Sequence, residues 1–187
     1  MDSEPKIIPP HGGYRKLQSF QMAEIVYDAT VKFCQKYIDR RSRTVDQMVQ
    51  AARSGKQNIA EGSMASATSR KTELKLVSVA RASLEELLID YQDFLRQREL
   101  PLWGKDDPAT KKVRALAYDV NRSYKTYASY VEGPAPAVSA NTIISLIHQT
   151  CYLLDQQLRQ LEHQFLEEGG FTERLYEARR NAKLRNT

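Results

Sequence analysis

The chain has 187 residues, of which 41% are hydrophobic and 27% charged, and its formal net charge at pH 7 is +5. This length predicts one domain with a sizeable core, and the composition excludes both a disordered tail and a membrane-spanning protein. The first residues lack the pattern of a signal peptide, and two cysteines cannot form a disulfide framework, so we expect a cytoplasmic protein.

Glycine and proline divide the chain into long segments of helical periodicity, and no segment shows the alternation of a strand. The sequence therefore predicts an all-α protein, an antiparallel four-helix bundle over residues 18–168. A flexible leader is expected at 1–17 and a basic C-terminal helical tail at 169–187. An insertion at about 105–137 is expected to hold an extra helix.

The first predicted helix, at about 18–40, has two apolar stripes instead of one. One stripe comprises Phe20, Ala23, Tyr27, Val31, Cys34 and Ile38, and the other comprises Met22, Ile25, Val26, Ala29 and Phe33. A helix of a monomeric bundle needs only one apolar stripe. The second stripe therefore suggests that this helix also contacts another subunit.

The second predicted helix begins at Thr44, where Gln47 completes a capping box, and ends at Gly62. Opposite its core face, small and polar residues recur at heptad spacing: Gln47, Ala51, Ser54, Asn58 and Glu61. Such a line either receives another helix at close distance or faces water, and the spacing alone favours neither.

The remaining helices have recognisable ends. A long helix is predicted over about 69–100, where Pro101 stops it. Asp107 and the following proline then form the start of a weaker helix that extends to about residue 130. The last long helix is expected over about 141–168, and a short basic helix over about 172–185.

The net charge is unevenly distributed along the chain. Residues 40–81 carry a net charge of +6, residues 82–168 a net −4 and residues 169–187 a net +3. Basic blocks of this kind attract phosphate backbones, although a solvated helix face is the plainer interpretation. The candidate phosphate contacts are Arg40, Arg41, Arg43, Arg53, Lys56, Arg70, Lys71 and Lys75, with Arg174, Arg179, Arg180, Lys183 and Arg185 in the tail.

No catalytic, cofactor or metal motif emerges, so we expect no enzyme, no cofactor and no metal. The three histidines lack the spacing of zinc or di-iron sites, and no nucleophile elbow or phosphate-binding loop occurs. A pair of His148 with Cys151 is conceivable but unsupported by any feature that would lower the thiol pKa. Helix capping and salt bridges explain Glu61 and Glu86 better than acid–base chemistry does.

Two segments carry a family resemblance. Residues 51–62 have the sequence AARSGKQNIAEG and residues 80–87 the sequence ARASLEEL. They resemble the N-I-A-E-G and A-x-x-S-L-x-E-L segments of a four-helix-bundle family. That family includes proteins encoded within intervening sequences of large-subunit ribosomal RNA and the accessory variability determinant of diversity-generating retroelements. The EGGFTERL at 168–175 is similar to a suffix of one branch. The residues that carry the resemblance are Ser54, Asn58, Ile59, Ala60, Glu61, Gly62, Ser83, Glu86, Gly169 and Gly170.

The resemblance implies a four-helix bundle that assembles into a ring-like homopentamer with a basic surface. In the retroelement accessory protein, that surface serves nucleic acid and a reverse-transcriptase partner. We therefore expect a non-enzymatic oligomer that binds nucleic acid, in particular structured RNA, or assists a partner that processes nucleic acid. The alternative is a protein–protein scaffold with no nucleic-acid role. Tyrosine is favoured at protein interfaces, and four tyrosines would suit such a surface, Tyr118, Tyr124, Tyr127 and Tyr130.

Overall fold

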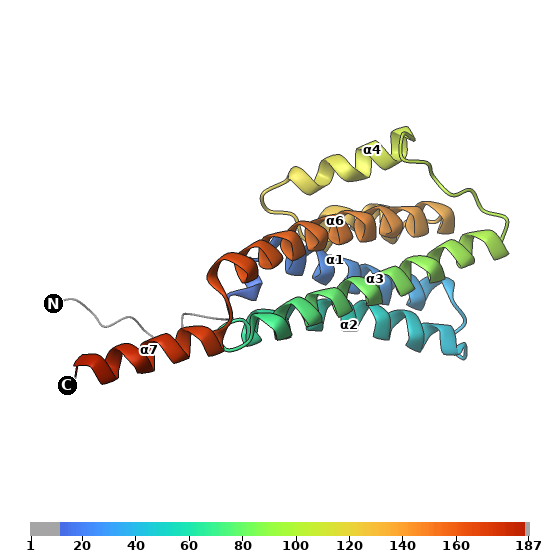
Figure 1. Cartoon of the computed structure of the whole chain (residues 1–187). Helices are drawn as coiled ribbons and strands as arrows, with labels where there is room; N and C mark the ends of the chain where they lie inside the picture. The colour runs from blue at the N-terminus through green and yellow to red at the C-terminus, as the bar shows by residue number, and fades with distance from the viewer. Residues whose placement is uncertain (1–11, 186–187) are drawn as a thin grey trace.

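The computed structural model describes residues 12–185, and Figure 1 shows that nearly all of its regular structure is helical. No strand occurs among these residues, so the predicted all-α class is confirmed. The helices are α1 (Gln18–Tyr37), α2 (Arg43–Ala65), α3 (Arg70–Gln97), α4 (Pro108–Ala115), α5 (Tyr124–Val131), α6 (Pro136–Glu168) and α7 (Phe171–Arg185), with short 3-10 helices at Tyr14–Lys16 and Leu116–Tyr118.

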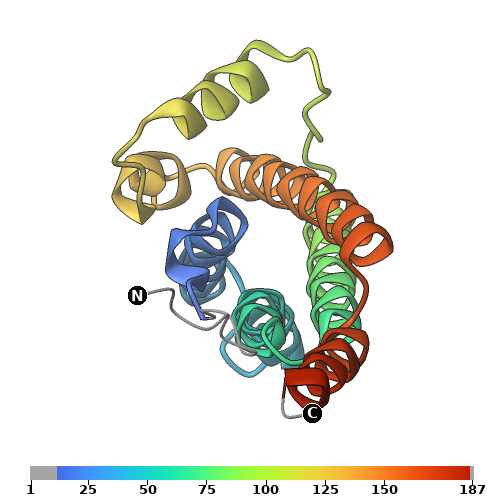
Figure 2. The same ribbon diagram turned by 60° about the vertical axis from the view of Figure 1, so that its left-hand side comes forward.

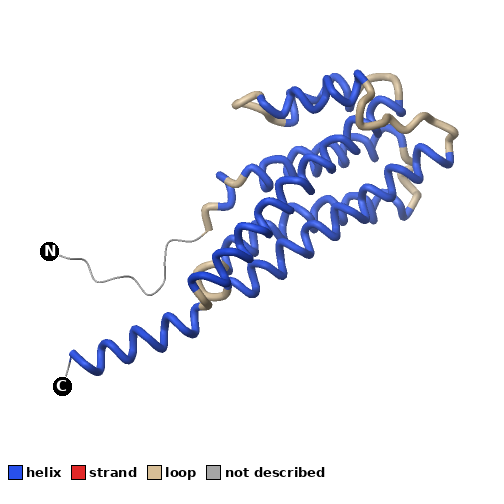
Figure 3. Tube along the Cα trace, turned by 45° about the horizontal axis from the view of Figure 1, so that its top comes forward, coloured by secondary structure: helices blue, strands red, loops and turns tan. Residues whose placement is uncertain are grey.

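Helices α1, α2, α3 and α6 form the bundle. Each contacts two others in the cyclic order α1, α2, α3, α6, and Figure 2, which looks nearly along the bundle, shows the four arranged around one core. The insertion packs on one side, with α5 against α1 and α6, and α4 against α6. The trace in Figure 3 shows α7 extending beyond the end of the bundle.

The core centres on an aromatic cluster between α1 and α3. The Phe33 ring centroid lies 4.9 Å from that of Tyr91 and 4.8 Å from that of Phe94, both in edge-to-face geometry. The buried Tyr91 hydroxyl donates a hydrogen bond of 3.1 Å to Thr30 Oγ1. Full burial of such a side chain contributes about 2–3 kcal/mol, and the polar hydroxyl is paired as burial requires.

Both apolar stripes of α1 are covered within the chain. Ala23, Val26, Ala29 and Phe33 have no exposed surface, and α1 contacts α2, α5 and α6. The partly buried side chains of Tyr27 and its neighbours also pack against the core. Packing within the chain therefore accounts for both stripes, and the expected contact of α1 with another subunit stays a prediction.

The line of small and polar residues on α2 packs against α3 over most of its length. Of the two alternatives, contact with another helix or exposure to water, the first therefore holds there. Ser54 Oγ lies 2.9 Å from Ser83 Oγ, and Asn58 Nδ2 donates to the carbonyl of Ser54 at 2.9 Å. A Cβ at Gly55 would lie 2.9 Å from Leu84 Cγ, so glycine is what allows the two helices to approach this closely.

The ends of α2 differ from the prediction. The helix continues through Gly62 to Ala65, because Gly62 faces the Glu73 carbonyl, 3.4 Å from where its Cβ would be, rather than ending the helix. At the start, the N-cap is Ser42, whose side chain accepts from the Thr44 amide at 3.2 Å. Thr44 therefore lies inside the first turn and is not the cap.

The insertion contains two short α-helices instead of one. The Asp107 carboxylate caps α4 as expected, accepting from the Ala109 amide at 2.8 Å. The chain then leaves the helical conformation at Asp119, whose carboxylate accepts from the Asn121 amide at 2.9 Å. A reciprocal capping box at Ser123 starts α5. Local side-chain bonds of this kind compete with helix continuation, which explains the break.

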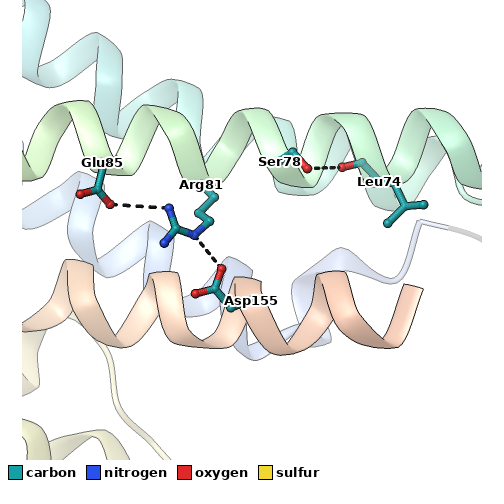
Figure 4. Close-up of polar contacts among 5 residues, drawn as sticks. All are labelled: Leu74, Ser78, Arg81, Glu85 and Asp155. Atoms are coloured by element: carbon teal, nitrogen blue, oxygen red, sulfur yellow. Dashed lines mark hydrogen bonds and ion pairs between the residues drawn. The ribbon is translucent and has the colours of Figure 1, made fainter. Parts of the chain in front are cut away.

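An ion pair joins α3 to α6 across the bundle surface (Figure 4). Arg81 Nε lies 2.6 Å from Asp155 Oδ1, and Arg81 Nη1 lies 3.6 Å from Glu85 Oε2 on its own helix. Both partners of the interhelical pair are 38% exposed, so solvent screens the pair. It contributes at most about 1 kcal/mol and fixes the register of α6 against α3 more than it stabilises the fold.

The predicted leader and tail have different outcomes. Residues 1–11 of the expected leader lie outside the described part of the chain. Residues 12–17 pack on the bundle, since the Gly12 amide donates to the Ser63 carbonyl at 3.3 Å and the Tyr14 ring contacts Phe20. The expected basic tail forms α7. Within residues 12–185, no helix has the length and hydrophobicity needed to cross a membrane.

Candidate nucleic-acid interface

Most of the predicted phosphate contacts lie at one end of the bundle or the other, with Arg53 and Lys56 between them on α2. Arg40 and Arg41 lie in the α1–α2 turn, Arg43 begins α2, and Arg70 begins α3 after α2 has ended. At 1.5 Å per residue, the 23 residues of α2 separate these ends by about 35 Å. The basic block of the sequence is therefore two separate clusters and not one continuous patch.

The cluster at the α1–α2 turn consists of three exposed arginines, Arg40, Arg41 and Arg43. None of their side chains forms an ion pair with another described residue. The nearby Asp39 carboxylate is engaged by the Arg41 backbone amide at 2.9 Å, although Asp46 also lies exposed in the first turn of α2. The positive end of the α2 dipole adds to the attraction for an anion here.

Two other candidates are held by contacts within the chain. Lys56 Nζ lies 4.4 Å from the Tyr27 ring centroid, a cation–π contact between α2 and α1. Arg70 donates to the Gln164 carbonyl at 2.8 Å near the end of α6, as basic side chains often do at helix C-termini. Arg53, on the outer face of α2, is exposed. Lys56 and Arg70 therefore have structural roles that the sequence analysis did not predict.

The second cluster is at the other end of the bundle, where α3 begins and α7 extends away (Figure 1). Lys71 and Lys75 are exposed on the first turns of α3, and Arg179 and Arg180 are exposed on α7. The remaining tail candidates, Arg174, Lys183 and Arg185, belong to the same helix. The fold thus brings two basic segments that are far apart in the sequence to the same end of the molecule.

The motif residues have structural positions in or beside the α2–α3 contact. Ser54 and Ser83 form a hydrogen bond across it, and Asn58 donates to Ser54 within α2. Ile59 is fully buried, and Gly62 permits close packing. The other motif positions on these helices are Ala60, which packs partly buried against the core, and Glu61 and Glu86, which are exposed. Gly169 ends α6 at a φ of 66°, a conformation that favours glycine, and Gly170 donates from its amide to the Glu173 carboxylate.

Residues that could support catalysis are not brought together. His163 pairs with Glu167 at 3.2 Å on the surface of α6, while His148 is exposed and His11 lies outside the described residues. Among the described side chains, no three His, Cys, Asp or Glu residues are grouped closely enough to hold a metal ion.

Neither thiol is expected to react in the folded protein. Burial raises the pKa of Cys34 to about 12, with a contribution from Asp90, and raises that of Cys151 to about 11 despite the lowering effect of Arg81. Since the thiolate is the reactive form, Ellman's reagent at mildly alkaline pH should modify neither cysteine until urea is added, when both should react. Rapid modification of the native protein would contradict this prediction.

The tyrosines of the insertion mostly face inward. Tyr127 is fully buried, Tyr130 packs against the core, and the Tyr124 hydroxyl donates to Glu132 Oε1 at 2.7 Å. Only Tyr118 of this group, 88% exposed, is available to a partner. Tyr124, Tyr127 and Tyr130 therefore attach the insertion to the bundle, and Tyr118 alone of the four remains for the interface that the scaffold alternative requires.

A large cleft between the insertion and α6 was not predicted from the sequence. Cationic residues of the insertion line it, including Lys105, Arg114 and Arg122, together with Trp103 just before the insertion. Regional charge does not point to this segment, because residues 82–168 carry a net negative charge. The one sequence signal for the cleft is the single tryptophan, Trp103, just before an insertion that holds several basic residues.

No protein-family model matches the chain, and no curated protein or solved structure matches it either. The family resemblance therefore depends on the motif residues alone.

Proposed function

We propose that this protein is a non-enzymatic helical bundle that binds structured RNA through exposed basic side chains. The observation that carries the proposal is the cluster of Arg40, Arg41 and Arg43, exposed and without an ion pair to any described residue, at the positive end of α2. The basic residues at the α3 start and on α7 support a second contact. The resemblance to a family with nucleic-acid-associated members points the same way.

Arginine clusters of this kind bind phosphates and do not read base sequence. Each contact releases counterions, so affinity falls steeply as salt rises, with little preference among sequences. A folded RNA offers phosphates in several directions, which suits a protein whose basic clusters lie at opposite ends. The function proposed is thus to hold or shape RNA, alone or for a partner that processes nucleic acid.

Assembly and location are part of the same proposal. The resemblance implies a homopentamer, the composition suggests a cytoplasmic location, and both statements stay predictions. Because α5 packs against α1, the contacts of such a ring would have to use surfaces that α5 leaves exposed. Light scattering on the freshly purified protein, with the absorbance ratio that detects nucleic acid, reports the oligomer mass and any bound RNA together.

The proposal predicts a specific change in salt dependence. The triple variant Arg40→Ala, Arg41→Ala, Arg43→Ala should bind a structured RNA more weakly than the unmodified protein. The plot of log affinity against log salt has a negative slope, and this slope should become shallower by about 3, since each lost phosphate contact removes about 0.9 from its magnitude. Filter binding or fluorescence anisotropy at several salt concentrations measures both values.

The matched control removes the same number of charges elsewhere. Lys32, Lys112 and Arg159 are exposed and lie outside the proposed contacts, so their triple alanine variant should keep the original slope. An equal effect of both variants would show attraction by net charge alone. If the unmodified protein does not bind RNA at low salt, the proposal is wrong. Co-purification of a defined acidic protein would then favour the scaffold alternative.

A further inference from the structure

The insertion stands over the outer side of α6 and encloses a cleft of about 1200 Å³. One wall is formed by segment 102–122 and the floor by α6 between Asn141 and Leu153, while the start of α1 and Gln92 of α3 complete it. Figure 2 shows α4 standing over α6 on the side away from the bundle core. The volume exceeds what one small ligand requires.

The lining of this cleft contains no acidic residue. Four side chains that are cationic at neutral pH line it, Lys16, Lys105, Arg114 and Arg122. They are accompanied by three aromatic side chains, those of Trp103, Tyr118 and Tyr152, and by the amides of several glutamines. With no carboxylate in the lining, the basic side chains give this concave site a positive potential, which favours an anionic ligand.

The acidic residues of the insertion are engaged outside the cleft. The Asp107 carboxylate caps α4 and that of Asp119 caps the turn at Asn121. Asp106 pairs with Lys111 at 3.2 Å. These local bonds explain how a segment with several carboxylates still presents only cations and neutral groups to the cleft.

Two polar atoms in cleft-lining residues have no hydrogen-bond partner within the described chain, Gln149 Oε1 and Arg122 Nε. Gln149 uses only its Nε2, which donates to the Arg114 carbonyl at 3.2 Å. An unpaired buried polar group costs about 1–3 kcal/mol. A modest rotation of either side chain towards a polar ligand would supply the missing partner.

We propose that this cleft binds a nucleotide unit, with the phosphate among the cationic side chains and the base against the aromatic ones. Phosphate alone would not use the aromatic residues, and an apolar ligand would leave the cations unpaired. Bases stack on aromatic side chains whatever their sequence, and glutamine amides offer donors and acceptors for their edges. This site is separate from the α1–α2 cluster, so either proposal can fail while the other stands.

The chain provides its own probe, because Trp103 is its only tryptophan and lines the cleft. Titration of the full-length protein with uridine monophosphate should quench tryptophan emission to saturation. Uridine and inorganic phosphate should each bind at least about tenfold more weakly, a difference of about 1.4 kcal/mol. Titration with a short oligouridylate shows whether the ligand is a free nucleotide or a unit of a nucleic-acid strand. Tighter binding of the oligomer assigns the site to a strand, and equal or weaker binding assigns it to the free nucleotide.

Matched variants on α4 separate the cleft from general charge effects. Arg114→Ala should weaken nucleotide binding roughly tenfold, the usual loss for one charge-assisted hydrogen bond. Lys112→Ala, which changes an exposed residue of the same helix outside the cleft, should have no effect. The Arg40, Arg41, Arg43 triple variant should also keep full quenching. Unchanged emission with both nucleotide and oligomer, or equal binding of phosphate and uridine monophosphate, would overturn the proposal.

Discussion

Replacing Gly55 with valine should lower the free energy of unfolding by about 3 kcal/mol, the upper part of the range for overpacked cores. A first side-chain carbon at this position would lie 2.9 Å from both Cγ and Cδ2 of Leu84 and 3.6 Å from the Ala80 carbonyl. Leu84 is fully buried and cannot move aside cheaply. Valine adds two further carbons, so α2 and α3 would have to separate along the Ser54–Ser83 contact.

Helix propensity predicts the opposite change, a higher free energy of unfolding for the valine variant, so the experiment separates the two effects. In an exposed helix, replacing glycine gains up to about 1 kcal/mol. Urea unfolding monitored by circular dichroism measures the difference. Gly13→Val is the control, because no atom lies within 4 Å of its Cβ position. A Gly55→Val protein as stable as the original would show that the α2–α3 distance is not set by this glycine.

Replacing Asn141 with alanine should cost about 2 kcal/mol and loosen the start of the insertion. The buried Asn141 side chain accepts from the Trp103 amide at 2.8 Å and donates to the carbonyls of Pro101 and Ala137, both at 2.8 Å. Truncation leaves these backbone groups to find other partners, at about 1 kcal/mol or more for each one that remains buried.

The same variant should change the surroundings of Trp103. Without its anchor, the indole becomes more exposed, so its emission should shift to the red before any global unfolding in urea. Asn121→Ala is the matched control, since this asparagine is exposed and its recorded hydrogen bond uses the backbone amide. Identical emission of Asn141→Ala and the original protein would show that the anchor does not hold the tryptophan.

Helix positions could be predicted from the sequence because their signals are local. Apolar periodicity located all four bundle helices, and Asp107 before a proline located the start of α4. Gly62 was misinterpreted because a glycine that ends a helix and a glycine that faces another helix look identical in sequence. Only the position of the α3 backbone distinguishes the two.

The basic residues show the same limit. Regional net charge singles out the arginines of the α1–α2 turn, which are exposed, but it does not reveal that Lys56 covers the Tyr27 ring or that Arg70 reaches α6. Net charge also gives no sign of the cleft. The carboxylates of the insertion count against its basic residues in the sum, although they are engaged in caps and an ion pair outside the cleft. Charge counted along a chain does not show which charges share a surface.

The cover that α5 gives to α1 has a consequence for how the bundle responds to dilution. The chain leaves α3 and returns to α6 at the same end of the bundle, as the bond from Asn141 to Pro101 shows, so a short loop would suffice to connect them. The longer path places α5 against α1 and α6, so this cover comes from the same chain. A cover supplied by another copy is lost as concentration falls, whereas a cover within the chain is not. The face of α1 that α5 covers therefore stays covered at any dilution at which the chain remains folded.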